Sequence, residues 1–350
     1  MVAGLEREEV TVRTGPRSGL PVVVAIHSTR LGQAVGGCRI WHYPDWREGL
    51  EDALGLSASM TRKLAVCGLA NGGGKTVVAV PDCAPLGAQR RADALRDVGD
   101  VITSLSGRYA TGPDVGTAAA DMTIIGERTR HVFCKPRELG GSGDPSQHTA
   151  AGIVAALRAA CSRAFGSADL SRRLFAISGL GSVGGQLARQ LTAAGASLVV
   201  SDVDTQKSKL AKELGSSWAD PDEILTADVD LLIPAALGGV LTRGIVPHLR
   251  CAAIVGPADN QVAGPDVADL PHEQGIIWAP DYVVSAGGVI YALSMELQPH
   301  THANAQSSVQ AVEDTVTQTL DVAEHTGRAP VHAALELVHR RLTAPAGHPA

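Results

Sequence analysis

Two lysines and one aspartate in the first third of the chain could carry out acid–base chemistry. Only six of the 30 basic residues are lysine, and Lys63 and Lys75 lie twelve positions apart in MTRKLAVCGLANGGGKTVVAV. An amine can lose its proton when desolvated, whereas a guanidinium effectively cannot, so lysine in an arginine-rich chain indicates a specific role. Asp114 follows in TGPDVGT. Two amines and a carboxylate suit a zwitterionic substrate that exchanges protons at its α-nitrogen.

The two lysines can divide the work. One can hold a substrate carboxylate, and the other, beside the glycines of NGGGK, can polarise a carbonyl or activate water. An ordinary surface position is the usual place for a lysine, but it does not explain why lysine occurs here and almost nowhere else.

A glycine pattern in the middle of the chain indicates a dinucleotide site. Gly179, Gly181 and Gly184 form GxGxxG after the apolar run LFAIS, and Asp202 ends the next apolar run 18 residues after Gly184. The glycines permit a tight turn and a close approach to a pyrophosphate, which the N–H groups of the helix N-terminus then bind. The Asp202 carboxylate would accept hydrogen bonds from a ribose diol and repel a 2′-phosphate, which favours NAD over NADP. A tight turn without a ligand is the alternative.

Alternating strand and helix patterns must position these residues. In the first part of the chain we expect a strand at 21–27, a turn at LGQAVGG, a helix at 46–63, a short strand at LAVCGL, a glycine cluster at NGGGK, and a second strand at TVVAV. GGSGDPSQ (140–147) has the composition of a linker or hinge. Beyond it, strands at 174–178 and 197–202 and in VDLLIPAA, AAIVGPA and GIIWAPDYV are spaced as one parallel sheet, and the last 45 residues should be helices.

The composition excludes several classes of protein. A chain of 350 residues suits two domains, and 45% hydrophobic and 19% charged residues are typical of a globular protein. A formal charge of −6 gives no reason to bind nucleic acid or an anionic membrane. No apolar run is long enough to span a bilayer and no signal peptide is evident, so we expect a cytoplasmic protein. The six cysteines form no CxxC pair and the histidines no HExxH motif, so no metal is expected.

The chain resembles the leucine/phenylalanine/valine dehydrogenase branch of the Glu/Leu/Phe/Val amino-acid dehydrogenases, from about residue 20 to 345. The matching motifs are LGQAVGGCR, MTRK, NGGGKTV, TGPDVGT, GLGSVGG, PAALGG, GPADNQ and APDYVVSAGGVI. The resemblance implies a two-domain α/β fold. Residues 1–138 would form a substrate-binding and dimerisation domain, on which helices from about 315–350 pack back. Residues 139–314 would form a Rossmann NAD-binding domain. It also implies a homo-oligomer, a dimer or an octamer.

The resemblance also implies a role for each site residue in the oxidative deamination of an L-amino acid to a 2-oxo acid, ammonia and NADH. Lys75 would activate the attacking water and Asp114 would shuttle protons to and from the substrate nitrogen. Lys63, Gly37 and Asn260 would bind the substrate carboxylate. The cofactor would be held by Gly179, Gly181, Ser182, Val183, Gly184, Asp202, Thr149, Ala235, Ala258 and Ser285.

The family's side-chain pocket corresponds to the uncharged positions Val35, Met60, Gly112, Val289 and Ala292, which favours a hydrophobic substrate. Because Gly112 and Ala292 are small, we expect a large pocket that suits phenylalanine, with leucine and valine as close competitors.

Two positions depart from the family pattern. Ser285 stands where the family usually has asparagine, and Asp259 puts a carboxylate beside Asn260. These departures leave two alternatives open. One is a dehydrogenase for another amino acid such as glutamate, although the few lysines of the chain leave no obvious cation to bind a second carboxylate. The other is an NAD-binding regulatory homologue that has lost catalysis, against which Lys63, Lys75 and Asp114 argue.

Overall fold

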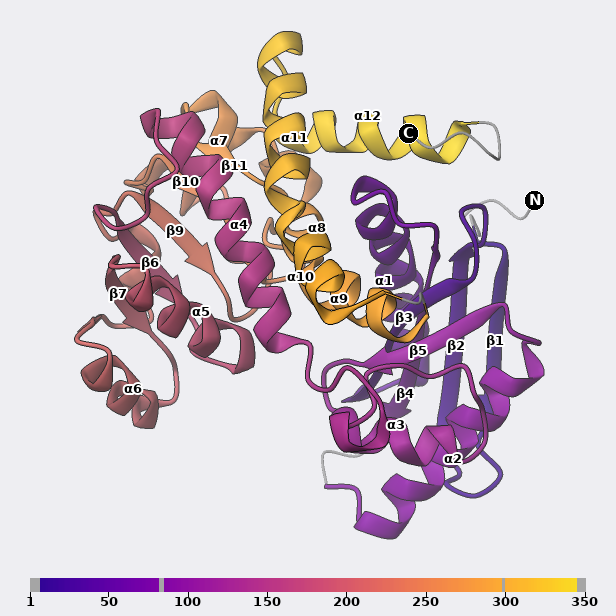
Figure 1. The fold of residues 1–350 in the computed structure, drawn as a ribbon. Helices are drawn as coiled ribbons and strands as arrows, with labels where there is room; N and C mark the ends of the chain where they lie inside the picture. Colours follow the sequence, from indigo (N-terminus) through magenta and orange to yellow (C-terminus); the bar gives the residue numbers. More distant parts are fainter. Residues whose placement is uncertain (1–6, 82–84, 298–299, 345–350) are drawn as a thin grey trace. The chain divides into compact units, whose positions relative to one another are not determined.

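A computed structural model describes residues 7–81, 85–297 and 300–344. The chain divides into two compact units (Figure 1). Unit 1 comprises Met1–Asp144, Ala292–Pro299 and Arg340–Ala350, and unit 2 comprises Pro145–Tyr291 and His300–His339.

Unit 1 is built on a five-stranded sheet of order β1-β2-β4-β3-β5. β1 and β2 pair antiparallel, as do β2 and β4, whereas β3 pairs parallel with both β4 and β5. β3 lies between β4 and β5, and this matters for the site because β4 carries Lys75 and Asp114 directly follows β5. The strands are β1 (Glu9–Thr14), β2 (Pro21–Ser28), β3 (Ala34–His42), β4 (Gly72–Val80) and β5 (Tyr109–Pro113).

Helices cover both faces of this sheet. α1 packs on one face, where its Ala53 joins Val23, Val77 and Ala79 in an apolar cluster. α2 and α3 cover the other face, where Leu95, Ile102 and Ile125 pack with the alternate strand residues, such as Val22 and Val78. The alternation of buried residues on each strand produces these two cores. The helices are α1 (Trp46–Val66), α2 (Ala88–Ser104) and α3 (Ala119–Gly126).

Three expectations for unit 1 differ from the structure. LAVCGL is not a strand: α1 continues to Val66, because Leu64, Ala65 and Val66 extend its buried face. The glycine cluster of NGGGK, expected between two strands, instead supplies the first residues of β4, and the turn expected at LGQAVGG gives way to β3 from Ala34 onward. In both places the missing Cβ atoms let neighbouring elements approach closely: a Cβ on Gly74 would lie 2.7 Å from the Tyr109 ring.

Unit 2 contains a six-stranded parallel sheet of order β11-β10-β9-β6-β7-β8. Numbered from its first strand, this is the 3-2-1-4-5-6 order of a Rossmann fold, and the order reverses between β6 and β9. The predicted strand at 174–178 is confirmed, and that at 197–202 ends one residue early. The strands are β6 (Leu174–Ser178), β7 (Ser197–Ser201), β8 (Ser217–Trp218), β9 (Leu231–Pro234), β10 (Ala253–Ile254) and β11 (Ile277–Trp278).

The remaining helices include α5, which begins directly after the glycine-rich turn, and the helices of the C-terminal region. They are α4 (Ser146–Phe165), α5 (Ser182–Ala193), α6 (Ser208–Glu213), α7 (Leu270–Glu273), α8 (Asp281–Val284), α9 (Gly287–Glu296), α10 (His302–Gln310), α11 (Val312–Thr326) and α12 (Pro330–Thr343). α10 and α11 pack on α4 within unit 2.

The division into units differs from the expected domains in two ways. The boundary lies between Asp144 and Pro145 rather than at 138/139. Residues up to Asp144 stay with unit 1 because Glu296 accepts hydrogen bonds from the Ser142 N–H at 2.8 Å and the Cys134 N–H at 2.7 Å. Of the C-terminal helices, only the part from Arg340 onward belongs to unit 1; residues 315–339 belong to unit 2.

Candidate active site and dinucleotide site

Lys75 and Asp114 form an ion pair in unit 1. Lys75 Nζ lies 3.0 Å from Asp114 Oδ1, with the lysine side chain only 5% exposed and the aspartate 18%. They come from β4 and from the end of β5, the two strands that flank β3. Gly37 lies on β3 between them, and a Cβ there would be 2.6 Å from Asp114 Cβ. The missing side chain at Gly37 therefore makes room for the pair.

A second cation holds Asp114 from the other side. Arg39 Nε donates to Asp114 Oδ2 at 2.8 Å, and Arg39 Nη1 donates to Asp52 Oδ2 of α1 at 2.8 Å. The Tyr43 hydroxyl donates to the same Asp52 oxygen. The sequence analysis missed Arg39, although it lies two residues after Gly37 and so on the same face of β3.

These charges fix the ionisation of the site. Burial would raise the pKa of the Asp114 carboxyl, but the charges of Lys75 and Arg39 outweigh burial and hold that pKa below its ordinary value. Burial raises the pKa of the Cys38 thiol to about 12, so Cys38, on the other face of β3, stays neutral near Asp114. Asp114 is therefore a carboxylate at neutral pH.

Two of the other predicted substrate residues of unit 1, Met60 and Lys63, come from α1. Thr61 lies between Met60 and Lys63, and its backbone packs directly against Gly73, two residues before Lys75. His27 Nδ1 and Thr61 Oγ1, 2.8 Å apart, hold the helix to β2 at this level. Met60 and Lys63 are half-buried. The structure thus places Lys63 on the helix that covers the Lys75 face of the sheet.

Gly112 does not open a larger pocket. The Phe133 ring fills the space where its Cβ would lie, and Phe133 itself is buried. The argument that glycine at this position enlarges the side-chain pocket was therefore wrong, because an aromatic residue distant in sequence takes that space. Phe133 gave no signal that a pattern search could have used.

The glycine-rich turn of unit 2 has the predicted form. Gly179 has a φ of 108°, a conformation that favours glycine, and a Cβ on Gly184 would meet the Gly179 carbonyl. Among the described residues, nothing lies within 4 Å of a Cβ built on Gly181 and no side chain caps the N-terminus of α5, which begins at Ser182. The turn therefore presents backbone N–H groups to an open space, at the point where the strand order reverses. Ala235, after β9, borders the turn, and Val183 lies in the first turn of α5.

Asp202 follows β7 and is tied to the same turn. Its Oδ2 accepts the Leu180 N–H at 2.7 Å and its Oδ1 accepts the Asp204 N–H at 2.8 Å. Each carboxylate oxygen has two lone pairs, so both retain capacity for a ribose hydroxyl. The neighbouring Val203 is 87% exposed. An exposed apolar side chain thus follows Asp202, the predicted ribose-binding acid.

Thr149 and Ser285 lie where α4 and α9 cross. Gly288 lets Thr149 Oγ1 approach the start of α9, and Gly287 lets α9 approach Gly152 of α4. Among the described residues, the buried Ser285 Oγ has no hydrogen-bond partner. A buried hydroxyl without a partner beside Thr149 is consistent with a ligand that supplies one.

The remaining predicted residues lie on loops and on α9. Ala258 is buried and its N–H bonds the Pro234 carbonyl at 3.1 Å, so it lies beside the end of β9. Asn260 is exposed with a φ of 54°, and Asp281 holds its N–H. Asp259 is exposed as well. On α9, Val289 belongs to unit 2 and Ala292 to unit 1.

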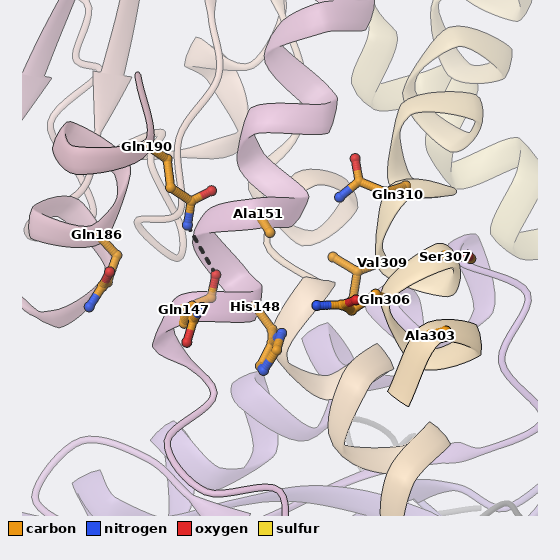
Figure 2. A pocket seen from close by; sticks show the side chains of 10 residues that line it. All are labelled: Gln147, His148, Ala151, Gln186, Gln190, Ala303, Gln306, Ser307, Val309 and Gln310. Atoms are coloured by element: carbon orange, nitrogen blue, oxygen red, sulfur yellow. Dashed lines mark hydrogen bonds between the residues drawn. The ribbon is translucent and has the colours of Figure 1, made fainter. Parts of the chain in front are cut away.

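A cavity of about 580 Å³ in unit 2 contains none of the predicted site residues. It lies among α4, α5 and α10, and Figure 2 shows glutamine side chains around it, with Gln190 Nε2 donating to the Gln147 carbonyl at 3.3 Å. Its lining includes His148, whose ring stacks on Tyr291 at 3.4 Å, and the Tyr291 hydroxyl lies 2.6 Å from His302 Nδ1. These contacts fix the first turn of α4, next to Thr149.

The residues of unit 2 fit a dinucleotide, since they combine a glycine turn, a free helix N-terminus, a strand-terminal acid and a buried hydroxyl without a partner. Together with the Lys–Asp pair of unit 1, they define an oxidoreductase that uses a nicotinamide dinucleotide. Among the described residues, no helix is long and apolar enough to cross a membrane.

Comparison with known proteins identifies the family. Residues 8–131 match the dimerisation domain of the Glu/Leu/Phe/Val dehydrogenases, and residues 200–335 match the Glutamate/Leucine/Phenylalanine/Valine dehydrogenase family. The chain belongs to the Glu/Leu/Phe/Val dehydrogenase family, as its motifs predicted.

Individual relatives support this assignment. Leucine dehydrogenase of Geobacillus stearothermophilus is 38% identical over 96% of this chain and 90% of its own. Phenylalanine dehydrogenase of Lysinibacillus sphaericus is 40% identical over 81% of this chain and 75% of its own. The crystal structure of L-tryptophan dehydrogenase from Nostoc punctiforme matches with a TM-score of 0.80 and 32% identity, over 96% of each chain. These matches confirm the two-domain fold class.

Proposed function

We propose that this protein catalyses the reversible, NAD-dependent oxidative deamination of a hydrophobic L-amino acid, namely phenylalanine, leucine or valine. The products would be the 2-oxo acid, ammonia and NADH. The observation that carries the proposal is the buried Lys75–Asp114 pair, in which an amine and an ionised carboxylate meet at 3.0 Å. An amino-acid deamination needs such a pair, because water must be activated and the substrate nitrogen must gain and lose protons.

The roles of the pair follow from its chemistry. Asp114, held as a carboxylate by its two cations, accepts a proton from the substrate ammonium and returns protons to the departing nitrogen. Lys75 orients the water that attacks the substrate's α-carbon and, in reverse, polarises the keto oxygen. Because the Lys75 side chain is almost fully buried, its amine has little contact with bulk solvent that could compete for its hydrogen bonds.

The substrate carboxylate would be bound by Lys63, with the Gly37 backbone and Asn260 assisting. The side chain would be received by Met60, Gly112, Val289 and Ala292, which are uncharged and favour a hydrophobic group. Because Phe133 takes the space beside Gly112, the residue at 112 gives no preference for phenylalanine over leucine and valine.

NAD fits better than NADP because Asp202 places a carboxylate at the end of β7 and repels a 2′-phosphate. NAD would supply the acceptor for the hydride of the substrate's α-carbon. Gly179, Gly181, Ser182, Val183 and Gly184 would bind its pyrophosphate. Thr149, Ala235, Ala258 and Ser285 would contact the remainder.

We further propose a cytoplasmic homo-oligomer, a dimer or an octamer. The match to a family dimerisation domain over residues 8–131 supports self-association.

Substitution of the two lysines tests the proposal. Lys75→Ala should lower kcat roughly 10²–10⁴-fold, as expected for loss of an acid–base group, with little change in NADH affinity. Lys63→Ala should mainly raise KM for the amino acid. The exposed Lys209 serves as a matched control, and Lys209→Ala should leave both constants unchanged. If both site variants kept near wild-type kcat/KM, the assignment of the substrate site would be wrong.

A panel of L-amino acids separates the alternatives. Turnover of phenylalanine, leucine or valine supports the proposal, and a preference for glutamate would replace it by the related activity. Tight NADH binding without turnover of any amino acid would indicate the regulatory homologue.

A further inference from the structure

We propose that Arg39 is a positioning residue that commits the two oxygens of Asp114 to different tasks, and that Asp52 and Tyr43 hold Arg39 in the geometry that this requires. The inference rests on the proposed function, because the task of Asp114 is the proton shuttle in deamination.

The contacts around Asp114 leave its carboxylate one orientation. Oδ2 accepts Arg39 Nε at 2.8 Å, and Oδ1 lies 3.0 Å from Lys75 Nζ. The backbone is fixed too, since the Asp114 N–H donates to Thr117 Oγ1 at 2.9 Å. Rotation of the carboxylate about its Cβ–Cγ bond would break both charge-assisted contacts.

The chemistry of arginine then distinguishes the two oxygens. A guanidinium keeps its protons at any physiological pH, so it can neither take a proton from Oδ2 nor relay one. Oδ2 is therefore an anchor. Oδ1, beside the Lys75 amine, is the oxygen that can exchange a proton with the substrate nitrogen.

Asp52 fixes the direction from which Arg39 approaches Asp114. Arginine and a carboxylate readily form a bidentate pair, in which two parallel N–H groups bind both oxygens. Here Arg39 Nη1 is instead bound to Asp52 at 2.8 Å, and the Tyr43 hydroxyl holds that same Asp52 oxygen. Asp52 thereby removes the end-on pair through Nη1 and Nη2, and Lys75, 3.0 Å from Oδ1, holds the oxygen that a side-on pair through Nε and Nη2 would need. The contact of Arg39 with Asp114 therefore stays monodentate through Nε.

The network also balances its charges. Lys75 and Arg39 are matched by Asp114 and Asp52, and the side chains of Arg39 and Asp52 are 17% and 28% exposed. Such a cluster could serve only to stabilise the fold of unit 1, so the test needs a measurement that stability alone would not change.

The test compares Arg39→Met, Arg39→Lys and Asp52→Asn with a control, Arg96→Met. Arg96 forms an ion pair with Glu127 at 2.8 Å in the same unit, away from Asp114. For each full-length variant, kcat, the KM values for amino acid and NAD, and the effect of D₂O on kcat are measured. Circular dichroism and NADH binding report whether the variant is folded.

We expect Arg39→Met to lower kcat by about 10- to 100-fold with an NAD KM within about twofold of wild type. The D₂O effect on kcat should grow, because proton transfer by an unanchored carboxylate becomes slower relative to the other steps. Arg39→Lys should recover part of kcat, since an ammonium can bind one carboxylate but not bridge two. Arg96→Met should resemble wild type.

Asp52→Asn keeps the inference testable if Arg39→Met fails to fold. It removes only the charge that competes for Arg39, and it should lower kcat several-fold with an increased D₂O effect. An unchanged kcat and D₂O effect in a folded Arg39→Met or Asp52→Asn protein, while wild type is active, would overturn this inference alone. A wild-type protein that deaminates no amino acid would overturn the proposed function and this inference with it.

Discussion

Asp202 combines two tasks in one side chain. Its carboxylate would bind the ribose, and it already accepts the Leu180 N–H of the glycine turn at 2.7 Å. Replacement by alanine would therefore remove both the proposed ribose contact and an anchor of the turn that is proposed to bind the pyrophosphate. A hydrogen bond to a charged group contributes about 1.5–3 kcal/mol.

We predict that Asp202→Ala raises the Kd for NADH at least about tenfold. It should also reduce the ratio by which the protein prefers NADH to NADPH. Fluorescence titration with both nucleotides measures the change. Asp204→Ala is the matched control, because Asp204 is exposed and caps only the Gln206 N–H. A wild-type protein that binds NADH and NADPH equally would contradict the assigned role.

Single residues differ in how visible they are to a sequence analysis. Lys75 and Asp114 could be predicted because lysine is rare in this chain and aspartate stands in a distinctive motif. Arg39 and Asp52 could not, because arginine and aspartate are common here and their contact joins a strand to a helix. Phe133 fills the space beside Gly112 from 21 positions away, a relation that only the folded chain reveals.

At the level of elements, the packing of α1 on β4 places Lys63 near the face that carries Lys75. Gly73 is the point of closest approach, since its Cβ would collide with the Thr61 backbone. Gly55 of the same helix is exposed, and a Cβ there would meet nothing within 4 Å. The two glycines thus have opposite consequences when replaced.

We predict that Gly73→Ala destabilises the protein by more than about 2 kcal/mol and raises KM for the amino acid, because α1 must move away from the sheet. Gly55→Ala should stabilise by roughly 0.5–1 kcal/mol, as expected for alanine over glycine within a helix. Thermal unfolding of both variants gives the comparison. A Gly73→Ala protein as stable as wild type would show that α1 does not need this close approach.

The elements of unit 2 were easier to predict than those of unit 1. Parallel strands such as 174–178 are short apolar runs between turn residues, and the pattern is clear. In unit 1 the glycines of NGGGK resemble a loop, yet they belong to β4 because contacts with α1 and β5 leave no room for side chains. Tertiary packing overrode the local preference there.

At the scale of the whole molecule, acid sensitivity should differ between the units. Among described residues, the carboxyls with lowered pKa in unit 1 include the paired Asp100 and Asp114. Those of unit 2, Asp169 and Asp266, lie at the surface. A carboxyl whose pKa is lower in the folded than in the unfolded protein stabilises the fold at pH values above its unfolded-state pKa. This stabilisation is lost as the pH falls through its folded-state pKa.

We therefore predict that the midpoint temperature of the first thermal unfolding transition falls as the pH decreases from about 5 to 3, and that this transition is the unfolding of unit 1. Calorimetry at several pH values measures it. The Asp114→Asn protein should be less stable than wild type at pH 7, but its stability should fall less than that of wild type when the pH is lowered. An Asp114→Asn protein with the same pH dependence as wild type would contradict the assigned ionisation.

The central claim is that a hydride leaves the α-carbon of a hydrophobic L-amino acid for NAD, and labelled substrate tests it most directly. Wild-type protein is given NAD and L-leucine or L-phenylalanine deuterated at the α-carbon, and the products are analysed by NMR and mass spectrometry. The account predicts one deuterium in each NADH, equal amounts of ammonia and 2-oxo acid, and no turnover of the D-enantiomers. NADH without deuterium, or loss of the label to water, would contradict it.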